Sequence, residues 1–146
     1  MSDPFYNKTV TVWNRYVDGI WEKETWLPTV IGNVRLLVSR GNNIQNSGNS
    51  AADSARLHIS NEMSIPAKPY LPAEAWGALP LDEKKKYFTL DSGNESFFIE
   101  GDMSSVNAEV YGDGFFSFMK ENYSNCFKIT SVDRFEIIPH FEVWGK

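Results

Sequence analysis

Cysteine and histidine are scarce in this 146-residue chain, which has one cysteine and two histidines. The single cysteine, Cys126, cannot form an internal disulfide, and no Cys/His spacing typical of a zinc site occurs. The sequence therefore predicts a fold that needs neither disulfides nor a bound metal and that suits a reducing compartment. Positive charge is not in excess either. The net charge of −5 argues against a non-specific nucleic-acid-binding protein, which normally carries a basic patch.

Long apolar runs are absent as well. No run approaches the roughly 18 residues that a membrane-spanning helix requires, so we expect no association with a membrane. Residues 1–8 lack the apolar core of a signal peptide, which indicates a protein made in the cytoplasm. The length fits one domain over residues 1–146 that is large enough to bury a hydrophobic core.

Aromatic residues, in contrast, are abundant: 5 Trp, 6 Tyr and 10 Phe make up 14% of the chain. Such residues favour β-strands. Residues 9–16 show the two-residue alternation of a strand. The dipeptide Asp18-Gly19 that follows provides the positive φ of a tight hairpin turn, and residues 20–26 form the predicted return strand. We expect Pro28 to end this strand, because proline cannot donate a hydrogen bond to a neighbouring strand.

Several further segments have strand or short-helix character. Strands are expected at residues 30–39, 56–63, 87–90, 96–100, 127–133, 135–138 and 141–144. Gly32 indicates a β-bulge in the first of them. Short helices are expected at residues 74–76, 80–86 and 115–122, and the lysine run 84–86 is expected to be a solvated helix end. This pattern predicts a mainly β fold, an antiparallel barrel or sandwich with two or three short helices.

No catalytic motif stands out. The chain contains no Gly-x-Ser-x-Gly nucleophile elbow and no Walker loop. A catalytic triad would place His58 or His140 beside a serine or Cys126 with a third orienting group. We expect His58 to be a half-exposed strand residue and Cys126 to be a small core thiol. The sequence therefore predicts no catalytic residue, no bound metal and no cofactor.

Two polar stretches remain to be explained. Residues 40–55 consist mostly of Asn, Ser, Gly and Ala and cannot bury enough apolar surface to order themselves. Between Lys86 and Lys120 there is no Lys or Arg, and six acidic residues occur, namely Asp91, Glu95, Glu100, Asp102, Glu109 and Asp113. Their spacing does not match a calcium-binding loop. They form either a solvated rim or a face that repels DNA or binds a basic partner.

Short segments spread over nearly the whole chain have a recognisable pattern. They are Pro72-Ala73-Glu74-Ala75-Trp76, Tyr87-Phe88-Thr89-Leu90 and Ile99-Glu100-Gly101-Asp102, together with residues 9–16, 26–31, 127–133 and 140–146. In them the chain resembles a family of small virion proteins of tailed phages and prophages of Gram-positive bacteria, the minor capsid or head–tail joining proteins. More distantly it is similar to phage head-closure proteins, or stoppers. Residues 141–146 and the connection 133–140 depart from the family pattern, so we expect the last strand to pack differently.

The resemblance implies a structural role and no enzymatic activity. It implies a small antiparallel β-barrel with a long polar loop that assembles as a ring of 12 or 6 copies in the phage neck. The adaptor or portal ring lies above such a ring and the tail terminator or tail tube lies below it. Packaged DNA passes close by without sequence recognition. The alternatives are a tail terminator or tail-completion ring and, from another class, a small hydrolase or ligand-binding barrel.

Within such a ring, two groups of residues acquire expected roles. The polar loop would point toward the ring axis and help to gate the channel, through Arg40, Asn42, Asn43, Gln45, Asn46, Asn49, Asp53 and Arg56. Fully extended, its 16 residues span roughly 50 Å, so out and back they cover about half that. The alternative is a disordered surface excursion. The six acidic residues would face the lumen or a neighbouring ring, where like charge avoids trapping DNA phosphates.

Overall fold

The computed structural model describes residues 6–17, 24–39, 54–136 and 139–146. Within them the strands are β1 (Lys8–Val17), β2 (Glu24–Ser39), β3 (Ser54–Ser60), β4 (Ile65–Pro66), β5 (Phe97–Glu100), β6 (Cys126–Phe135) and β7 (His140–Gly145). The helices are α1 (Ala73–Gly77), α2 (Leu81–Lys84) and α3 (Phe115–Asn122), with a 3-10 helix, η1 (Ala108–Gly114), just before α3.

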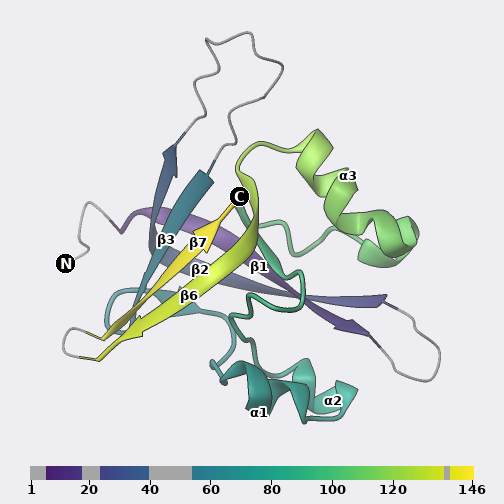
Figure 1. The fold of residues 1–146 in the computed structure, drawn as a ribbon, viewed down its shortest axis with the longest axis horizontal. Coiled ribbons are helices and arrows are strands. Elements are labelled where there is room, and N and C mark those ends of the chain that lie inside the picture. Colours follow the sequence, from purple (N-terminus) through teal and green to yellow (C-terminus); the bar gives the residue numbers. More distant parts are fainter. Residues whose placement is uncertain (1–5, 18–23, 40–53, 137–138) are drawn as a thin grey trace, which may run out of the picture.

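The strands form a closed antiparallel ring. Hydrogen-bonded neighbours run in the order β1-β5-β6-β7-β3-β2, and β2 pairs again with β1, while β4 adds to β2. Figure 1 shows this barrel with α3 on one side and the α1–α2 pair on another. The predicted mainly β fold, a small antiparallel barrel with short helices, is therefore confirmed. None of the helices in the described ranges is long and apolar enough to cross a membrane.

Two hydrophobic clusters hold the fold together, one on each side of β1. Val10 and Val12 point into the barrel interior, which Phe98, Leu57 and Val143 also fill. On the opposite face of β1, aromatic and aliphatic side chains pack beneath α3; this outer cluster consists of Trp13, Trp26, Phe97, Ile99, Phe115, Met119 and Cys126. β1 is therefore buried on both faces. This explains why apolar residues occur at both even and odd positions of the strand.

The predicted β1–β2 hairpin is present, but its register differs from the prediction. A two-residue turn at Asp18-Gly19 would place Val17 opposite residue 20, whereas Val17 lies opposite Glu24. The tight-turn register is therefore wrong, and the connecting residues 18–23 lie outside the described part of the chain. Tertiary packing decides the register, because it buries Trp26 in the outer cluster against Phe97.

Pro28 does not end the return strand, contrary to the prediction, and β2 continues to Ser39. The Pro28 carbonyl accepts a 2.7 Å hydrogen bond from Lys68 Nζ, so the backbone of Pro28 faces away from β1. The missing N–H of proline therefore costs no β1–β2 hydrogen bond. The predicted bulge near Gly32 lies at Asn33, whose φ of 54° accompanies the register shift between β1 and β2.

Residues 87–90 do not form the predicted strand. A single parallel bridge joins Phe88 to Tyr70. Next to it, the buried amide of Asn14 takes over both backbone groups of Thr89: Nδ2 donates to the carbonyl at 2.7 Å, and Oδ1 accepts from the N–H at 3.1 Å. A side chain therefore replaces a neighbouring strand at this point. Of the separate strand predicted at 135–138, Phe135 is instead the last residue of β6 and Glu136 lies in a turn, while residues 137 and 138 lie outside the described residues.

The predictions for the short helices, for Cys126 and for His58 agree with the structure. α1, α2 and α3 occupy the three predicted positions, and α3 covers the predicted residues 115–122. Cys126 is buried, and desolvation raises the pKa of its thiol to about 12. This confirms the prediction of a core thiol. His58 is half-buried on β3, as predicted.

Lys84 contradicts the expected solvated lysine run, because only 1% of its surface is exposed. Its ammonium group donates to the carbonyl of Gly77 at 3.0 Å and to that of Leu79. It also lies 4.5 Å from the ring centroid of Tyr16 and 5.3 Å from that of Trp76. The amine thus crosslinks α1, α2 and β1, and desolvation lowers its pKa.

Replacing Lys84 with methionine should lower the free energy of unfolding by about 2–3 kcal/mol. The substitution leaves two partly buried carbonyls without their donor, at about 1–3 kcal/mol for each unsatisfied group. Lys85→Met is the matched control, because Lys85 is exposed, and it should change the value by less than about 0.5 kcal/mol. Urea denaturation followed by tryptophan fluorescence measures both. Equal effects of the two variants would contradict the structural role of Lys84.

Candidate functional site

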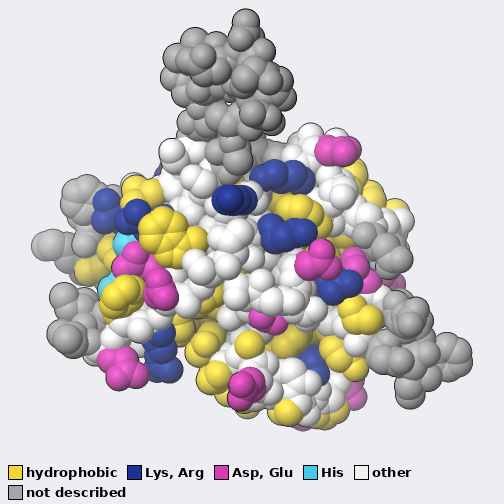
Figure 2. Space-filling view, in the orientation of Figure 1, with side chains coloured by type: hydrophobic (Ala, Val, Ile, Leu, Met, Phe, Trp, Pro, Cys, Tyr) yellow, Lys and Arg dark blue, Asp and Glu magenta, His cyan; other side chains and the backbone are white. Residues whose placement is uncertain are grey.

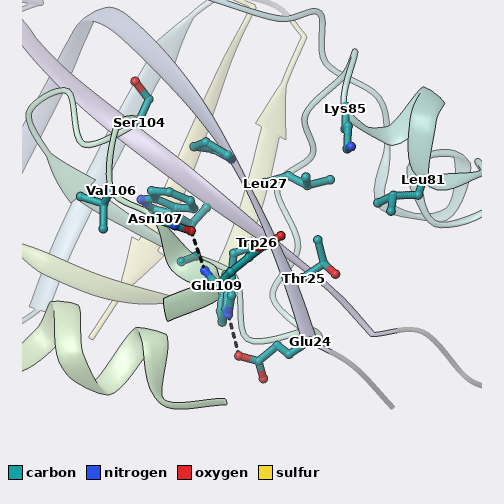
Figure 3. A pocket seen from close by; sticks show the side chains of 13 residues that line it. Glu24, Thr25, Trp26, Leu27, Leu81, Lys85, Ser104, Val106, Asn107 and Glu109 are labelled. Carbon is teal, nitrogen blue, oxygen red and sulfur yellow. Dashed lines mark hydrogen bonds between the residues drawn. The ribbon is translucent and has the colours of Figure 1, made fainter. Parts of the chain in front are cut away.

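An open groove of about 560 Å³ lies beside the β1–β2 hairpin. One wall is β2, from Glu24 to Pro28, with Trp13 of β1 behind it. Leu81 and Lys85 of the α2 region form a second wall, and a third consists of Ser104, Val106 and Asn107 with the first two residues of η1, Ala108 and Glu109. Figure 3 shows these segments converging around the indole of Trp26. The groove thus joins parts of the chain that are distant in sequence.

Local hydrogen bonds shape two walls of the groove. Asn107 Oδ1 accepts from the backbone N–H of Glu109 at 3.1 Å and so caps η1 at its first turn. Trp26 Nε1 donates to Glu24 Oε1 at 2.6 Å, which fixes the indole at the groove floor (Figure 3). The lining combines aromatic and aliphatic surface with amide, hydroxyl, carboxylate and amine groups. Such a mixture is typical of a surface that binds another chain.

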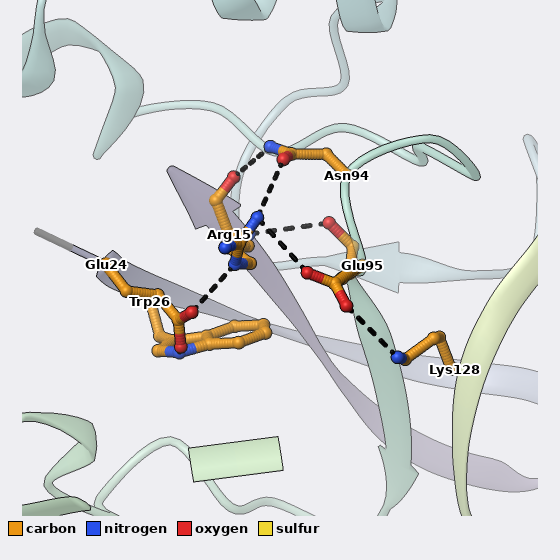
Figure 4. A network of polar contacts seen from close by, with 7 residues as sticks. Arg15, Glu24, Trp26, Asn94, Glu95 and Lys128 are labelled. Carbon is orange, nitrogen blue, oxygen red and sulfur yellow. Dashed lines mark hydrogen bonds and ion pairs between the residues drawn. The ribbon is translucent and has the colours of Figure 1, made fainter. Parts of the chain in front are cut away.

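Arg15 organises a polar network at the same end of the hairpin (Figure 4). Its Nε lies 2.9 Å from Glu24 Oε2, and its Nη1 lies 3.2 Å from Asn94 Oδ1 and 3.4 Å from Glu95 Oε2. Asn94 Nδ2 donates back to the Arg15 carbonyl at 2.6 Å. Glu95 also contacts Lys128 Nζ at 3.4 Å. The network ties the two hairpin strands to the turn before β5 and to β6.

Burial decides what the charged groups near the groove can do. The Glu24 side chain is only 10% exposed, and its two oxygens are engaged by Arg15 and Trp26. Glu24 is therefore a structural anion, held by a charge-assisted hydrogen bond. Lys85 and Glu109 are the exposed charged residues of the lining. Among the described residues of the lining, Glu24 and Glu109 are the only groups of metal-ligand type, with no histidine or cysteine beside them.

The six acidic residues predicted to form one face have diverse surroundings. Glu95 pairs with Arg15 and Lys128, and Glu100 lies 3.5 Å from Lys8 Nζ. Asp102 accepts hydrogen bonds from the hydroxyl and backbone N–H of Ser104, which lower the pKa of its carboxyl.

The surroundings of the other three acidic residues also differ from one another. Asp91 accepts from the backbone N–H of Gly93 at 2.7 Å, Glu109 lines the groove, and the Asp113 side chain lies outside the described part. At least two of the six carboxylates are thus paired with cations of the same chain.

Most of the predicted gating loop lies outside the described residues, including Arg40, Asn42, Asn43, Gln45, Asn46, Asn49 and Asp53. Its last member, Arg56, is described and belongs to β3. The Arg56 guanidinium carbon lies 4.1 Å from the ring centroid of Trp144 on β7, a cation–π contact. Arg56 is therefore held against the barrel wall, and gating by the loop remains a prediction.

Sequence reasoning did not find the groove. Trp13 and Trp26 could be assigned to a core or an interface from their aromatic character, and Arg15 only to one face of a strand. One signal for this region was available in the sequence. Arg15 and Glu24 carry opposite charges on the two strands of a predicted hairpin, which favours an ion pair between them. The contribution of residues 104–109 and of Lys85 depends on long-range packing, which local patterns do not encode.

The chain belongs to a family of unknown function, DUF6751, whose model matches residues 5–146. The match covers almost the entire chain, including every strand and helix described above. No curated protein and no solved structure matches the chain.

Proposed function

We propose that this protein is a structural component of the phage neck, a head–tail connector of the stopper type that closes the DNA-filled head and joins it to the tail. The proposal rests first on the resemblance, which extends over nearly the whole chain. The barrel supports it, because this is the fold that the resemblance implies. In this role the protein performs no chemistry, and it acts as a ring of 12 or 6 copies in the virion.

The structural observation that carries the proposal is an open strand edge beside the groove. Over residues 24–27, the edge of β2 away from β1 has no strand partner among the described residues, and this open stretch ends at Pro28, which has no N–H and whose carbonyl accepts from Lys68 Nζ. Figure 1 shows this end of the hairpin extending from the barrel. An open edge can pair with an extended segment of another chain. A ring needs such a head-to-tail contact, in which different patches of neighbouring subunits meet.

The groove supplies side-chain contacts next to that open edge. Aromatic residues are enriched in protein interfaces, and charged residues usually lie at the rim. Trp26 at the floor and Lys85 and Glu109 as exposed charges follow this arrangement. In the proposed ring, a segment of the neighbouring subunit occupies the groove. Assembly then covers the exposed strand edge, which otherwise favours aggregation.

A tail terminator or tail-completion ring is the alternative in the same class, since it also requires a closed ring of small barrels. The two roles differ in their partners. A stopper binds an adaptor ring on one side and the tail terminator on the other, whereas a terminator binds the tail tube. A cryo-EM map of the neck distinguishes them by the position of the barrel density. In the stopper role, the gating loop and the acidic residue Asp102 would lie near packaged DNA.

The proposal is tested on virions of the phage or prophage that encodes this chain. Antibodies against the purified protein, detected by immunogold electron microscopy, should label the head–tail junction of intact particles. Heads from a mutant that lacks the protein should lose their DNA and remain tailless. Virions without the antigen, or label confined to the distal end of the tail, would contradict the proposal.

A groove variant tests the ring contact itself. Reversing both exposed charges, Lys85→Glu with Glu109→Lys, should leave the barrel folded but abolish incorporation into particles. Lys86→Glu with Glu121→Lys is the matched control, because both residues are exposed and lie outside the groove lining. Far-UV circular dichroism verifies folding of each variant. Normal incorporation of the groove variant would show that the subunit contact lies elsewhere.

A further inference from the structure

The two histidines of the chain lie together on the outer face of the barrel, beside one glutamate. His58 on β3 is directly opposite Glu142 on β7, and His140 lies two residues before Glu142 on the same strand. The alternating neighbours Leu57 and Val143 point into the barrel and are fully buried. Figure 2 shows the histidines at the surface, next to acidic and hydrophobic side chains. Two adjacent strands therefore present three potential metal ligands to one side.

The distances between the three side chains suit a single ion. His140 Nε2 lies 3.2 Å from Glu142 Oε2, and His58 Nε2 lies 3.9 Å from Glu142 Oε1. One ligand atom from each residue lies within 4.8 Å of the other two. In a tetrahedral zinc site, with bonds of about 2.0–2.2 Å, neighbouring ligand atoms are roughly 3.3–3.5 Å apart. Side-chain rotations that close a separation of up to 4.8 Å by roughly 1.5 Å would complete this geometry.

A buried nitrogen without a hydrogen-bond partner is a further feature of this group. His58 Nε2 is buried and has no hydrogen-bond partner among the described residues. Leaving such a group without a partner costs free energy, which a metal–nitrogen bond would recover.

The neighbouring side chains hold the ligands and set the local charge. The His140 ring stacks on Phe135 of β6, with centroids 4.7 Å apart and planes within 7°. On the same face, Asp133 of β6 lies opposite Glu142 and adds negative charge, whereas Arg35 of β2 lies opposite His58. A second cation, Arg56, lies over the Trp144 ring. These two arginines weaken cation binding and favour a moderate affinity over a very tight one.

We propose that His58, His140 and Glu142 form a binding site for a divalent transition-metal ion such as Zn²⁺. Two imidazole nitrogens and a carboxylate provide three ligands, and the fourth position is open to water or to a group of another protein. The bound ion would connect β3 to β7. Mg²⁺ and Ca²⁺ should not compete, because these ions prefer sites made entirely of oxygen ligands. The inference is independent of the proposed neck function.

The test uses the untagged, full-length protein, because a histidine tag would itself bind metal. Titration with Zn²⁺ is followed by isothermal calorimetry and by long-range ¹H–¹⁵N NMR of the imidazoles. Only two histidines exist, so the spectrum contains only the signals of His58 and His140. Both residues should shift together and saturate at one ion per chain, with a dissociation constant on the order of 10 μM. At a hundredfold excess over that constant, Zn²⁺ should raise the melting temperature by about 5–10 °C.

Variants identify the ligands. His58→Asn, His140→Asn and Glu142→Gln should each weaken Zn²⁺ binding at least tenfold. Glu74→Gln, at an exposed position on α1, is the matched carboxylate control and should bind as the parent does. Zn²⁺ binding that persists in the double histidine variant, or a titration that shifts neither or only one imidazole of the parent, would overturn the proposal. The parent titration decides the matter even if a variant fails to fold.

Discussion

Replacing Phe115 with alanine is expected to lower the free energy of unfolding by about 3–5 kcal/mol, the usual cost of removing a fully buried phenylalanine. Phe115 is 0% exposed and is the first residue of α3. Its ring centroid lies 4.7 Å from that of Trp13 at an angle of 71°, and 5.6 and 5.7 Å from those of Trp26 and Phe97. The substitution therefore opens a cavity at the centre of the outer cluster and loosens α3 from the barrel.

Guanidinium denaturation, followed separately by tryptophan fluorescence and by far-UV circular dichroism, measures this loss. Phe118→Ala is the matched control on the same helix. Phe118 is only partly buried and stacks on Tyr111 at 3.9 Å, so its removal should cost about 1–2 kcal/mol. If Phe115→Ala costs no more than Phe118→Ala, the outer cluster does not anchor α3 in the way described. The groove should widen in the Phe115 variant, because η1 connects directly to α3.

A methyl group at Gly145 should destabilise the barrel by about 2–3 kcal/mol, near the upper end of the usual range for overpacking. The added Cβ would lie 2.8 Å from Phe127 Cβ and 2.9 Å from Phe98 Cε1, both shorter than van der Waals contact. Strand β7 cannot shift easily to relieve this clash. The Lys146 N–H donates to the Lys128 carbonyl at 3.0 Å, and the Lys128 N–H donates to the Lys146 carbonyl at 2.9 Å.

The same glycine-to-alanine change at Gly77 is the control. A Cβ at Gly77 has no atom within 4 Å, so Gly77→Ala should be neutral or slightly stabilising through the reduced entropy of the unfolded chain. Thermal unfolding by differential scanning calorimetry compares the two variants with the parent. A melting temperature for Gly145→Ala within 1 °C of that of Gly77→Ala would show that the barrel interior can absorb a methyl group at this position.

Local patterns were sufficient for the elements whose residues alternate or carry clear end signals. β1 and β5 follow the predicted strands within one or two residues, and α3 covers the predicted residues 115–122. The ends of β2 were missed because the effect of Pro28 depends on which side its backbone faces. A proline whose backbone faces away from the neighbouring strand removes no hydrogen bond between the two strands. Only the observed pairing of β2 with β1 reveals which way Pro28 faces.

The sequence by itself determined the fold class, the hairpin between β1 and β2 and the core character of residues such as Cys126, because strand period and turn chemistry are local properties. Tertiary structure alone decided that Lys84 is buried, that Arg15 links four segments, and that His58 meets His140 and Glu142. Each of these results depends on strands and loops that are distant along the chain becoming neighbours when the sheet closes. Burial and charge pairing follow from that closure, and a local pattern carries no information about which distant surface will cover a given side chain.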